Sequence, residues 1–159
     1  MQHAATSPEE LPRPEDLAEM TGLEVMHAML DGRLPGAPIA ATLGYRLESV
    51  ADGRAVFRGA PGFAHANPMG TTHGGWYGTL LDSAMACAVM TRVPRGASYT
   101  TLEYKVNIVR PLPAGTEIRC EGIAGHVGRR TGVATGEIRG VADDRLYAIG
   151  STTCIVLGA

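Results

Sequence analysis

The sequence predicts an α+β domain in which an antiparallel sheet packs on one face of a long apolar helix. Residues 73–90 contain one charged side chain, Asp82, and open with a glycine pair, which indicates a buried helix. Two short strand-like segments joined by Asp52-Gly53 come before this helix. A run of longer strand-like segments comes after it. This order of hairpin, helix and antiparallel strands is typical of the α+β class.

The chain is expected to form one domain. Its 159 residues are 45% hydrophobic, enough to bury a core. Residues 1–14 carry several prolines and acidic side chains and are predicted to be a flexible tail, because such a composition buries too little apolar surface to order itself. Residues 15–159 are predicted to be the domain.

Local signals define the smaller elements. Thr21-Gly22-Leu23-Glu24 is a helix capping box, and the apolar face that follows it ends at Gly32. Residues 43–50 and 54–59 indicate a hairpin around Asp52-Gly53. Three later strands are predicted at 116–127, 131–139 and 145–157, with turns at residues 128–130 and 143–144.

The strand predicted at residues 99–110 alternates along its length. Apolar residues alternate with polar ones, the first set being Leu102, Tyr104, Val106 and Ile108 and the second Thr101, Glu103, Lys105 and Asn107. The apolar face is therefore expected to lie on the helix.

Asp82 is the central candidate for chemistry. An unpartnered buried carboxylate costs several kcal/mol or becomes neutral, so chains seldom keep one without a use. In a helix that begins at the glycines, Asp82 shares one stripe with Gly75, Gly78, Met85 and Val89. The first amides of that helix would offer donors to an oxygen that gains negative charge. The structural alternative is a core carboxylate that only satisfies local donors.

A spaced set of polar residues favours the catalytic reading. Asn67 stands six residues before His73, a His-Gly-Gly run follows at 73–75, and Asp82 stands nine residues after His73. This set, together with the strand Tyr-Thr-Thr-Leu-Glu-Tyr-Lys-Val-Asn-Ile-Val-Arg-Pro at 99–111, resembles the hotdog-fold acyl-CoA thioesterases of the 4-hydroxybenzoyl-CoA thioesterase superfamily, in the branch similar to phenylacetate-degradation thioesterases. The likeness covers residues 23–157.

The resemblance implies a hotdog fold, with the sheet curled around the central helix, and hydrolysis of an aromatic or medium-chain acyl-CoA. Asp82 would be the general base or the nucleophile, and the Gly74 amide would polarise the thioester carbonyl. CoA is part of the substrate, so no separate cofactor is expected. The acyl group would lie near Gly75, Gly78 and Met85.

Other candidate residues each have a plainer reading. Asn67 would orient water or the carbonyl, or it would bond its own loop backbone. His73 would contact the substrate, or it would cap the helix. Thr101 matches a family position with a hydroxyl near the reacting centre, although threonine is common in strands. Arg129 and Arg130 would bind CoA phosphates, or they would be solvated turn residues.

Composition limits the expected classes of binding partner and the expected cellular compartment. The net charge of −2 argues against nucleic-acid or membrane-surface binding. Three cysteines without a Cys-x-x-Cys pair indicate reduced cytoplasm and no zinc site, and no metal is expected, since His65 and His126 lack spaced partners. No secretory signal is recognised, and Asp82 interrupts the longest apolar stretch, so no membrane span is expected.

The predicted assembly is a homodimer or a tetramer of two dimers, because the long regular strand at 101–109 would be an exposed edge. The resemblance implies that Asp82 of one chain faces Gly74 of the other. Two alternatives to the thioesterase remain: a non-catalytic acyl-CoA binding or sensing module, and a hotdog hydratase or dehydratase. The latter typically needs an Asp before the Asn at a spacing that is missing here.

Overall fold

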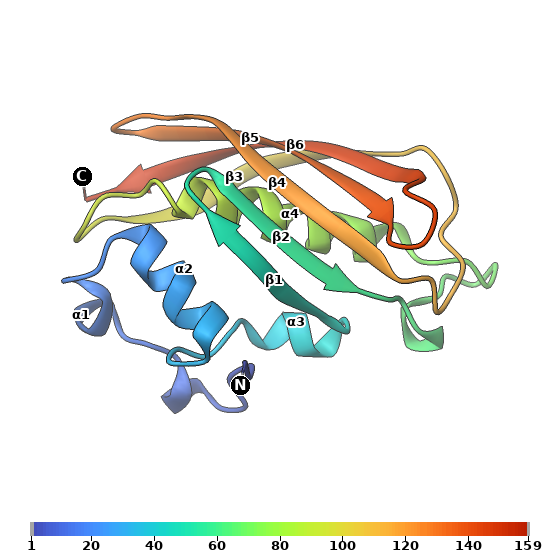
Figure 1. Ribbon diagram of the computed structural model, residues 1–159, viewed down its shortest axis with the longest axis horizontal. Helices are drawn as coiled ribbons and strands as arrows, with labels where there is room; N and C mark the ends of the chain where they lie inside the picture. Colours follow the sequence, from blue (N-terminus) through green and yellow to red (C-terminus); the bar gives the residue numbers. More distant parts are fainter. Residues whose placement is uncertain (1, 159) are drawn as a thin grey trace.

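The computed structural model describes residues 2–158 and consists of one antiparallel sheet wrapped over a central helix (Figure 1). The six strands lie in the order β1-β2-β4-β5-β6-β3. Their bounds are Tyr45–Ala51 (β1), Arg54–Gly59 (β2), Ser98–Ile108 (β3), Ile118–Val127 (β4), Thr131–Gly140 (β5) and Leu146–Leu157 (β6). The helix α4 spans Gly74–Met90. The predicted α+β architecture is confirmed, because each neighbouring pair of strands is antiparallel and α4 covers one face.

The sheet approaches α4 closely because glycines replace side chains where the two meet. A Cβ on Gly122 of β4 would overlap the carbonyl oxygen of Ala84. A Cβ on Gly136 of β5 would lie 2.8 Å from Cγ of Met85. The side chains of Leu81 and Met85 fill the space instead and are fully buried. Burial of such side chains contributes roughly 1.5–3 kcal/mol each and holds the helix against the sheet.

Smaller helices lie on the side of β1 away from the rest of the sheet, where Figure 1 shows them in blue and cyan. They are α1 (Pro14–Leu17), α2 (Gly22–Asp31) and α3 (Pro38–Thr42), with a 3₁₀ turn at Pro8–Glu10. A second 3₁₀ turn, Phe63–His65, follows β2 and is drawn in green. The predicted capping box of α2 is confirmed, since Thr21 accepts a hydrogen bond from the Glu24 amide. Gly32 ends α2 with φ of 77°, a left-handed conformation that glycine adopts readily. Between residues 2 and 158, no helix is long and apolar enough to cross a membrane.

The N-terminal segment contacts the domain. The Gly36 amide donates to the His3 carbonyl at 2.8 Å, and the Ala5 amide donates to the Gly36 carbonyl at 3.0 Å. Ala5 is buried at 4% exposure. These bonds pair residues 3–5 with the loop before α3. The flexibility of residues 1–14 stays a prediction from composition.

The strand β3 differs from the predicted strict alternation. Its pairing with β6 shifts register between Thr101 and Glu103, so Leu102 is the extra residue of a bulge. A bulge reverses which side chains face the helix. Thr101 therefore contacts α4 on one side of the bulge, as Tyr104 does on the other. The sequence-based placement of Thr101 on the face away from the helix was wrong for this reason.

Candidate active site

Asp82 lies in the middle of α4 and is held by β3. Thr101 Oγ1 donates a hydrogen bond of 2.9 Å to Asp82 Oδ1. Burial raises the pKa of the Asp82 carboxyl above its ordinary value, and the Thr101 hydrogen bond offsets part of that rise. Within residues 2–158, no cation pairs with the carboxylate. A half-buried carboxyl with a raised pKa and one hydroxyl donor is suited to accepting a proton.

The helix is not buried on all sides, as its apolar sequence suggested. One stripe is only half-buried, and it consists of Thr79, Asp82, Ser83, Cys87 and Met90. The sheet packs on neighbouring positions of the helix, where Leu81, Met85 and Val89 are fully buried. The sheet of one chain thus leaves open the side of α4 that carries Asp82.

A cavity of about 460 Å³ adjoins this open stripe. Ser83, Cys87 and Met90 of α4 line it, and so does Tyr99, two residues before Thr101 on β3. The rest of the lining is mainly apolar and comes from the N-terminal segment, the helices α1, α2 and α3, the loop before α3, and the first two strands. Sequence reasoning missed this cavity, although the spacing of Ser83, Cys87 and Met90 at i, i+4 and i+7 was a readable sign of one shared face.

Two side chains that line the cavity join their hydroxyl groups in a hydrogen bond. Tyr45 Oη lies 2.9 Å from Ser83 Oγ, joining β1 to α4. The single hydrogen bond between them uses one of their two protons, so the other proton is available to an oxygen inside the cavity. Burial raises the pKa of Tyr45, which keeps the phenol protonated at neutral pH.

The start of α4 is capped by His73. Its Nδ1 accepts the Gly75 amide at 2.9 Å, which leaves the imidazole occupied as a helix cap. Among residues 2–158, the Gly74 amide has no acceptor. Gly74 thus keeps a donor at the positive end of the helix dipole. His73 thus caps the helix in this structure, while its contact with substrate and the Gly74 oxyanion donor stay predictions.

Asn67 organises its own loop. Its Oδ1 accepts the Met69 amide at 2.9 Å and the Thr71 amide at 3.2 Å. Its Nδ2 donates to Thr71 Oγ1 at 2.9 Å. This is the local backbone bonding that competed with a catalytic role in the sequence. In this conformation Asn67 shapes the loop that leads to His73.

The other candidate residues on α4, Gly75, Gly78 and Met85, have different surroundings. A Cβ on Gly78 would touch the Tyr104 ring at 3.4 Å, so this glycine admits β3 next to the helix. Gly75 is exposed beside the cap. Met85 packs against Gly136 and Gly150 of the sheet and does not line the cavity. The stripe drawn from the sequence thus joins residues that face different neighbours.

Comparisons with known proteins identify the family. The sequence profile of the thioesterase superfamily matches residues 69–146. A phenylacetic acid degradation-related protein from Ralstonia eutropha JMP134 is 30% identical, with a TM-score of 0.74 over 82% of this chain and 98% of that one. A mutant of the phenylacetic acid degradation protein PaaI from Thermus thermophilus is 30% identical, with a TM-score of 0.67 over 74% of this chain and 97% of that one. The chain belongs to the thioesterase superfamily.

A third structure bears on ligands. A hypothetical thioesterase protein from Streptococcus pneumoniae TIGR4, solved with coenzyme A, is 25% identical, with a TM-score of 0.67 over 75% of this chain and 91% of that one. No curated protein sequence matches the chain. The family resemblance inferred from the spacing of Asn67, His73 and Asp82 is confirmed, and the protein is a thioester hydrolase.

The arginine hairpin of this thioesterase lies at the end of the sheet near Asp82. Arg129 and Arg130 are exposed in the turn between β4 and β5. Thr131, the next residue, pairs with Ile155, and Ile155 pairs with Thr100 of β3. Two strand spacings, about 10 Å, therefore separate this corner of the sheet from the strand that holds Thr101.

The cysteines of the thioesterase are poor nucleophiles. Burial raises the pKa of the Cys87 thiol to about 12, so almost no thiolate forms at neutral pH. Burial also raises the pKa values of Cys120 and Cys154. Over residues 2–158, no three His, Cys, Asp or Glu side chains group as metal ligands.

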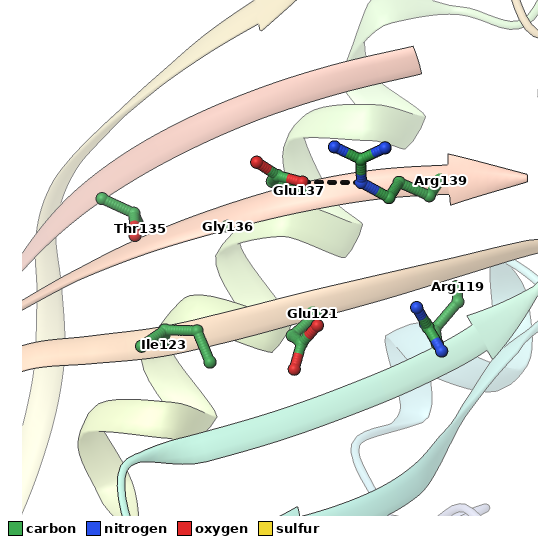
Figure 2. A pocket seen from close by; sticks show the side chains of 7 residues that line it. All are labelled: Arg119, Glu121, Ile123, Thr135, Gly136, Glu137 and Arg139. Carbon is green, nitrogen blue, oxygen red and sulfur yellow. Dashed lines mark hydrogen bonds and ion pairs between the residues drawn. The ribbon is translucent and has the colours of Figure 1, made fainter. Parts of the chain in front are cut away.

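A second hollow lies on the outer face of the sheet and is separate from Asp82. Figure 2 shows its side chains on β4 and β5 with α4 behind the sheet. It has a volume of about 140 Å³ and is lined by Arg119, Glu121, Ile123, Thr135, Gly136, Glu137 and Arg139. Its charges are partly paired, Arg139 with Glu137 at 2.7 Å. The sheet itself stands between this hollow and the half-buried carboxyl.

Proposed function

We propose that this thioesterase hydrolyses an acyl-CoA whose acyl group is aromatic or of medium chain length. The observation that carries the proposal is the Thr101 to Asp82 hydrogen bond beside a mainly apolar cavity of about 460 Å³. Pockets of several hundred Å³ with few polar groups suit apolar ligands. The cavity would take the acyl group, and the thioester would lie against Asp82.

The chemistry needs few residues. Asp82 would remove a proton from water while the water oxygen attacks the thioester carbonyl carbon, or its carboxylate would attack that carbon to form an anhydride that water then opens. The C–S bond then breaks, and the CoA thiolate leaves and takes up a proton. A thiolate is a good leaving group, so no strong acid is required. Thr101 would orient the carboxylate.

The oxyanion donor would come from a second chain. Gly74 and Asp82 are eight residues apart on α4. At about 1.5 Å per residue, their backbones are separated by about 12 Å, too far to serve one carbonyl group. A site that uses both therefore needs Asp82 from one protomer and Gly74 from its partner.

The edge strand offers a register for such a dimer. Along β3, Thr101 lies beside Asp82, Tyr104 beside Gly78 and Ile108 beside Gly74. If two copies of β3 pair antiparallel about a two-fold axis at Tyr104, Thr101 of one chain comes opposite the partner's Asn107, the residue next to Ile108. That pairing would bring Asp82 of one chain to the helix start of the other.

Exposed apolar side chains support this surface as an interface. Leu102 on β3 is 58% exposed, and Tyr104, Ile108 and Val109 are also exposed. Phe63 and Met69, in the segment before α4, are 90% and 85% exposed. A strand edge that exposes several apolar side chains and has no proline is a liability unless it is paired.

The proposal is tested by following thiol release across a panel of acetyl, octanoyl, dodecanoyl, benzoyl and phenylacetyl CoA thioesters. We expect an apolar aromatic or medium-chain thioester to give the highest kcat/KM and acetyl-CoA to give at least about tenfold less, since each buried CH₂ adds about 0.8 kcal/mol. Equal rates on all thioesters, or no release from any of them, would contradict it.

A further inference from the structure

The cavity that contacts Ser83, the residue next to Asp82 on α4, includes the N-terminal segment in its wall. Gln2, His3 and Ala4 line it, together with Gly36 and Ala37. Ser83, Cys87 and Tyr99 line it from the elements that hold Asp82. Because residues of α4 and of the N-terminal segment line the same cavity, it extends from the half-buried stripe of α4 towards the start of the chain. Figure 1 shows the N-terminal segment on the side of β1 where α2 and α3 lie.

Backbone and side-chain hydrogen bonds hold this segment in place. Gln2 Nε2 donates to the Leu47 carbonyl of β1 at 2.9 Å. His3 and Ala5 exchange backbone hydrogen bonds with Gly36 at 2.8 and 3.0 Å. None of these bonds involves Asp82, Thr101 or Gly74, so the segment can be changed without altering the residues proposed for chemistry.

The size and lining of the cavity indicate the shape of its occupant. The cavity volume of about 460 Å³ is in the range of pockets for drug-sized ligands, far more than an acetyl group needs. Met26, Met29 and Met90 line the cavity, and unbranched thioether side chains adapt to flexible apolar ligands. These features fit an extended, unbranched acyl tail better than a single small ring.

We infer that residues 2–4 form the end wall of the acyl pocket and set the longest unbranched acyl tail that the enzyme accepts. The inference rests on the proposed acyl-CoA hydrolysis and narrows it to medium-chain fatty acyl thioesters. A tail whose thioester lies at Asp82 passes Ser83, Cys87 and Tyr99, then α2, and stops against the segment that is bonded to Gly36.

The test is the dependence of kcat/KM on acyl length, from acetyl to palmitoyl CoA, in four proteins. These are the parent, a deletion of residues 2–5, Ala4→Trp, and Glu9→Trp, which adds the same indole at an exposed position outside the cavity. Deletion should move the optimum at least two carbons longer. Ala4→Trp should lower kcat/KM on the parent's best substrate about tenfold, because the indole would displace about two methylene groups of the acyl tail. Its kcat/KM on acetyl-CoA should stay within about twofold of the parent value. Glu9→Trp should match the parent.

Calorimetry measures the affinity of the same variants for acyl-CoA when each also carries Asp82→Asn. It tests the role of residues 2–4 in binding independently of hydrolysis. Dodecanoyl-CoA should bind Ala4→Trp about tenfold more weakly than it binds the Asp82→Asn parent. If the parent hydrolyses no acyl-CoA but this difference in affinity is found, the proposed function fails and the wall stands. An unchanged length optimum after both the deletion and Ala4→Trp, with unchanged dodecanoyl-CoA affinity, overturns the inference.

Discussion

Thr101 Oγ1 and Asp82 Oδ1 lie 2.9 Å apart, although the residues belong to different elements and are nineteen positions apart in sequence. The contact depends on the bulge at Leu102, which directs Thr101 towards α4. It joins the edge strand of the sheet to the only charged side chain of the central helix. The position and protonation of the carboxylate are thus coupled to β3, the strand through which we propose that two chains pair.

Removing the Thr101 hydroxyl should change the pH profile. The hydrogen bond from Thr101 lowers the pKa of Asp82 against the effect of burial, so Thr101→Val should raise that pKa further. A base must be deprotonated, and the acid limb of kcat/KM should therefore move to higher pH, with at least about tenfold lower activity at pH 7, the scale of one hydrogen bond to a charged group. Thr101→Ser keeps the donor and should retain the parent profile. Identical profiles for Val and Ser would show that the hydroxyl has no role.

Replacing both hairpin arginines should affect substrate binding. If Arg129 and Arg130 bind CoA phosphates, Arg129→Ala with Arg130→Ala should raise KM about tenfold and leave kcat nearly unchanged, because a remote contact is equal in ground and transition states. The same change should have little effect on a pantetheine thioester, which lacks the nucleotide phosphates. Equal losses on both substrates would instead indicate that these arginines brace the turn.

A charge at the centre of β3 should dissociate the proposed dimer. Tyr104→Glu would bring two carboxylates together across the two-fold axis, and like charges in paired strands repel. We expect light scattering at micromolar concentration to find a dimer or tetramer for the parent and a monomer with little activity for Tyr104→Glu. Tyr104→Phe and Val141→Glu, at an exposed turn position, serve as controls and should assemble normally. A stable and active monomeric parent would contradict the assembly.

Cys87 should be dispensable despite its place in the cavity wall. Since burial raises the pKa of its thiol to about 12, the thiolate fraction at pH 7.5 is negligible, and alkylation by iodoacetamide should be much slower than that of an ordinary exposed thiol. Cys87→Ala should keep kcat within about threefold, because the thiol takes no part in the reaction. A loss of about a hundredfold or more would assign the nucleophile to the cysteine and not to Asp82.

Much of the fold could be predicted because its signals are local. The Thr21 capping box, the Asp52-Gly53 turn and the start of α4 at the glycines each depend on a few neighbouring residues, and the structure has all three. The bulge at Leu102 could not be predicted, because it results from pairing with β6, a strand about fifty positions away. Strict alternation therefore placed Thr101 on the face away from the helix.

The site could be predicted only in part for a similar reason. Asp82 was recognisable as one charge in an apolar helix, and the family spacing added Gly74 and Thr101. The cavity was missed because its wall joins residues from distant segments, such as Gln2, Met29 and Tyr99. The roles of Asn67 and His73 were undecided because the sequence does not reveal that their polar atoms bond within the same loop and helix start.

Asp82→Asn is the most direct test of the catalytic assignment. The substitution keeps the volume of the side chain and removes the base or nucleophile, so kcat should fall about a hundredfold or more. Burial raises the pKa of Asp82 in the folded state, so the protonated carboxyl adds to the stability of the fold at low pH. That contribution is lost as the pH rises through the folded-state pKa. At pH 7 the charged form costs stability, and the Asn variant should have an equal or higher Tm.

The decisive measurement is kcat for Asp82→Asn on the best acyl-CoA of the panel, with Tm recorded on the same samples and Asp31→Asn, an exposed aspartate, as the control. We expect kcat to fall about a hundredfold or more with no loss of Tm, while Asp31→Asn keeps the parent rate. An Asp82→Asn enzyme that stays within a few-fold of the parent rate and melts at a lower temperature would overturn the catalytic assignment, because Asp82 would then serve the fold and not the reaction.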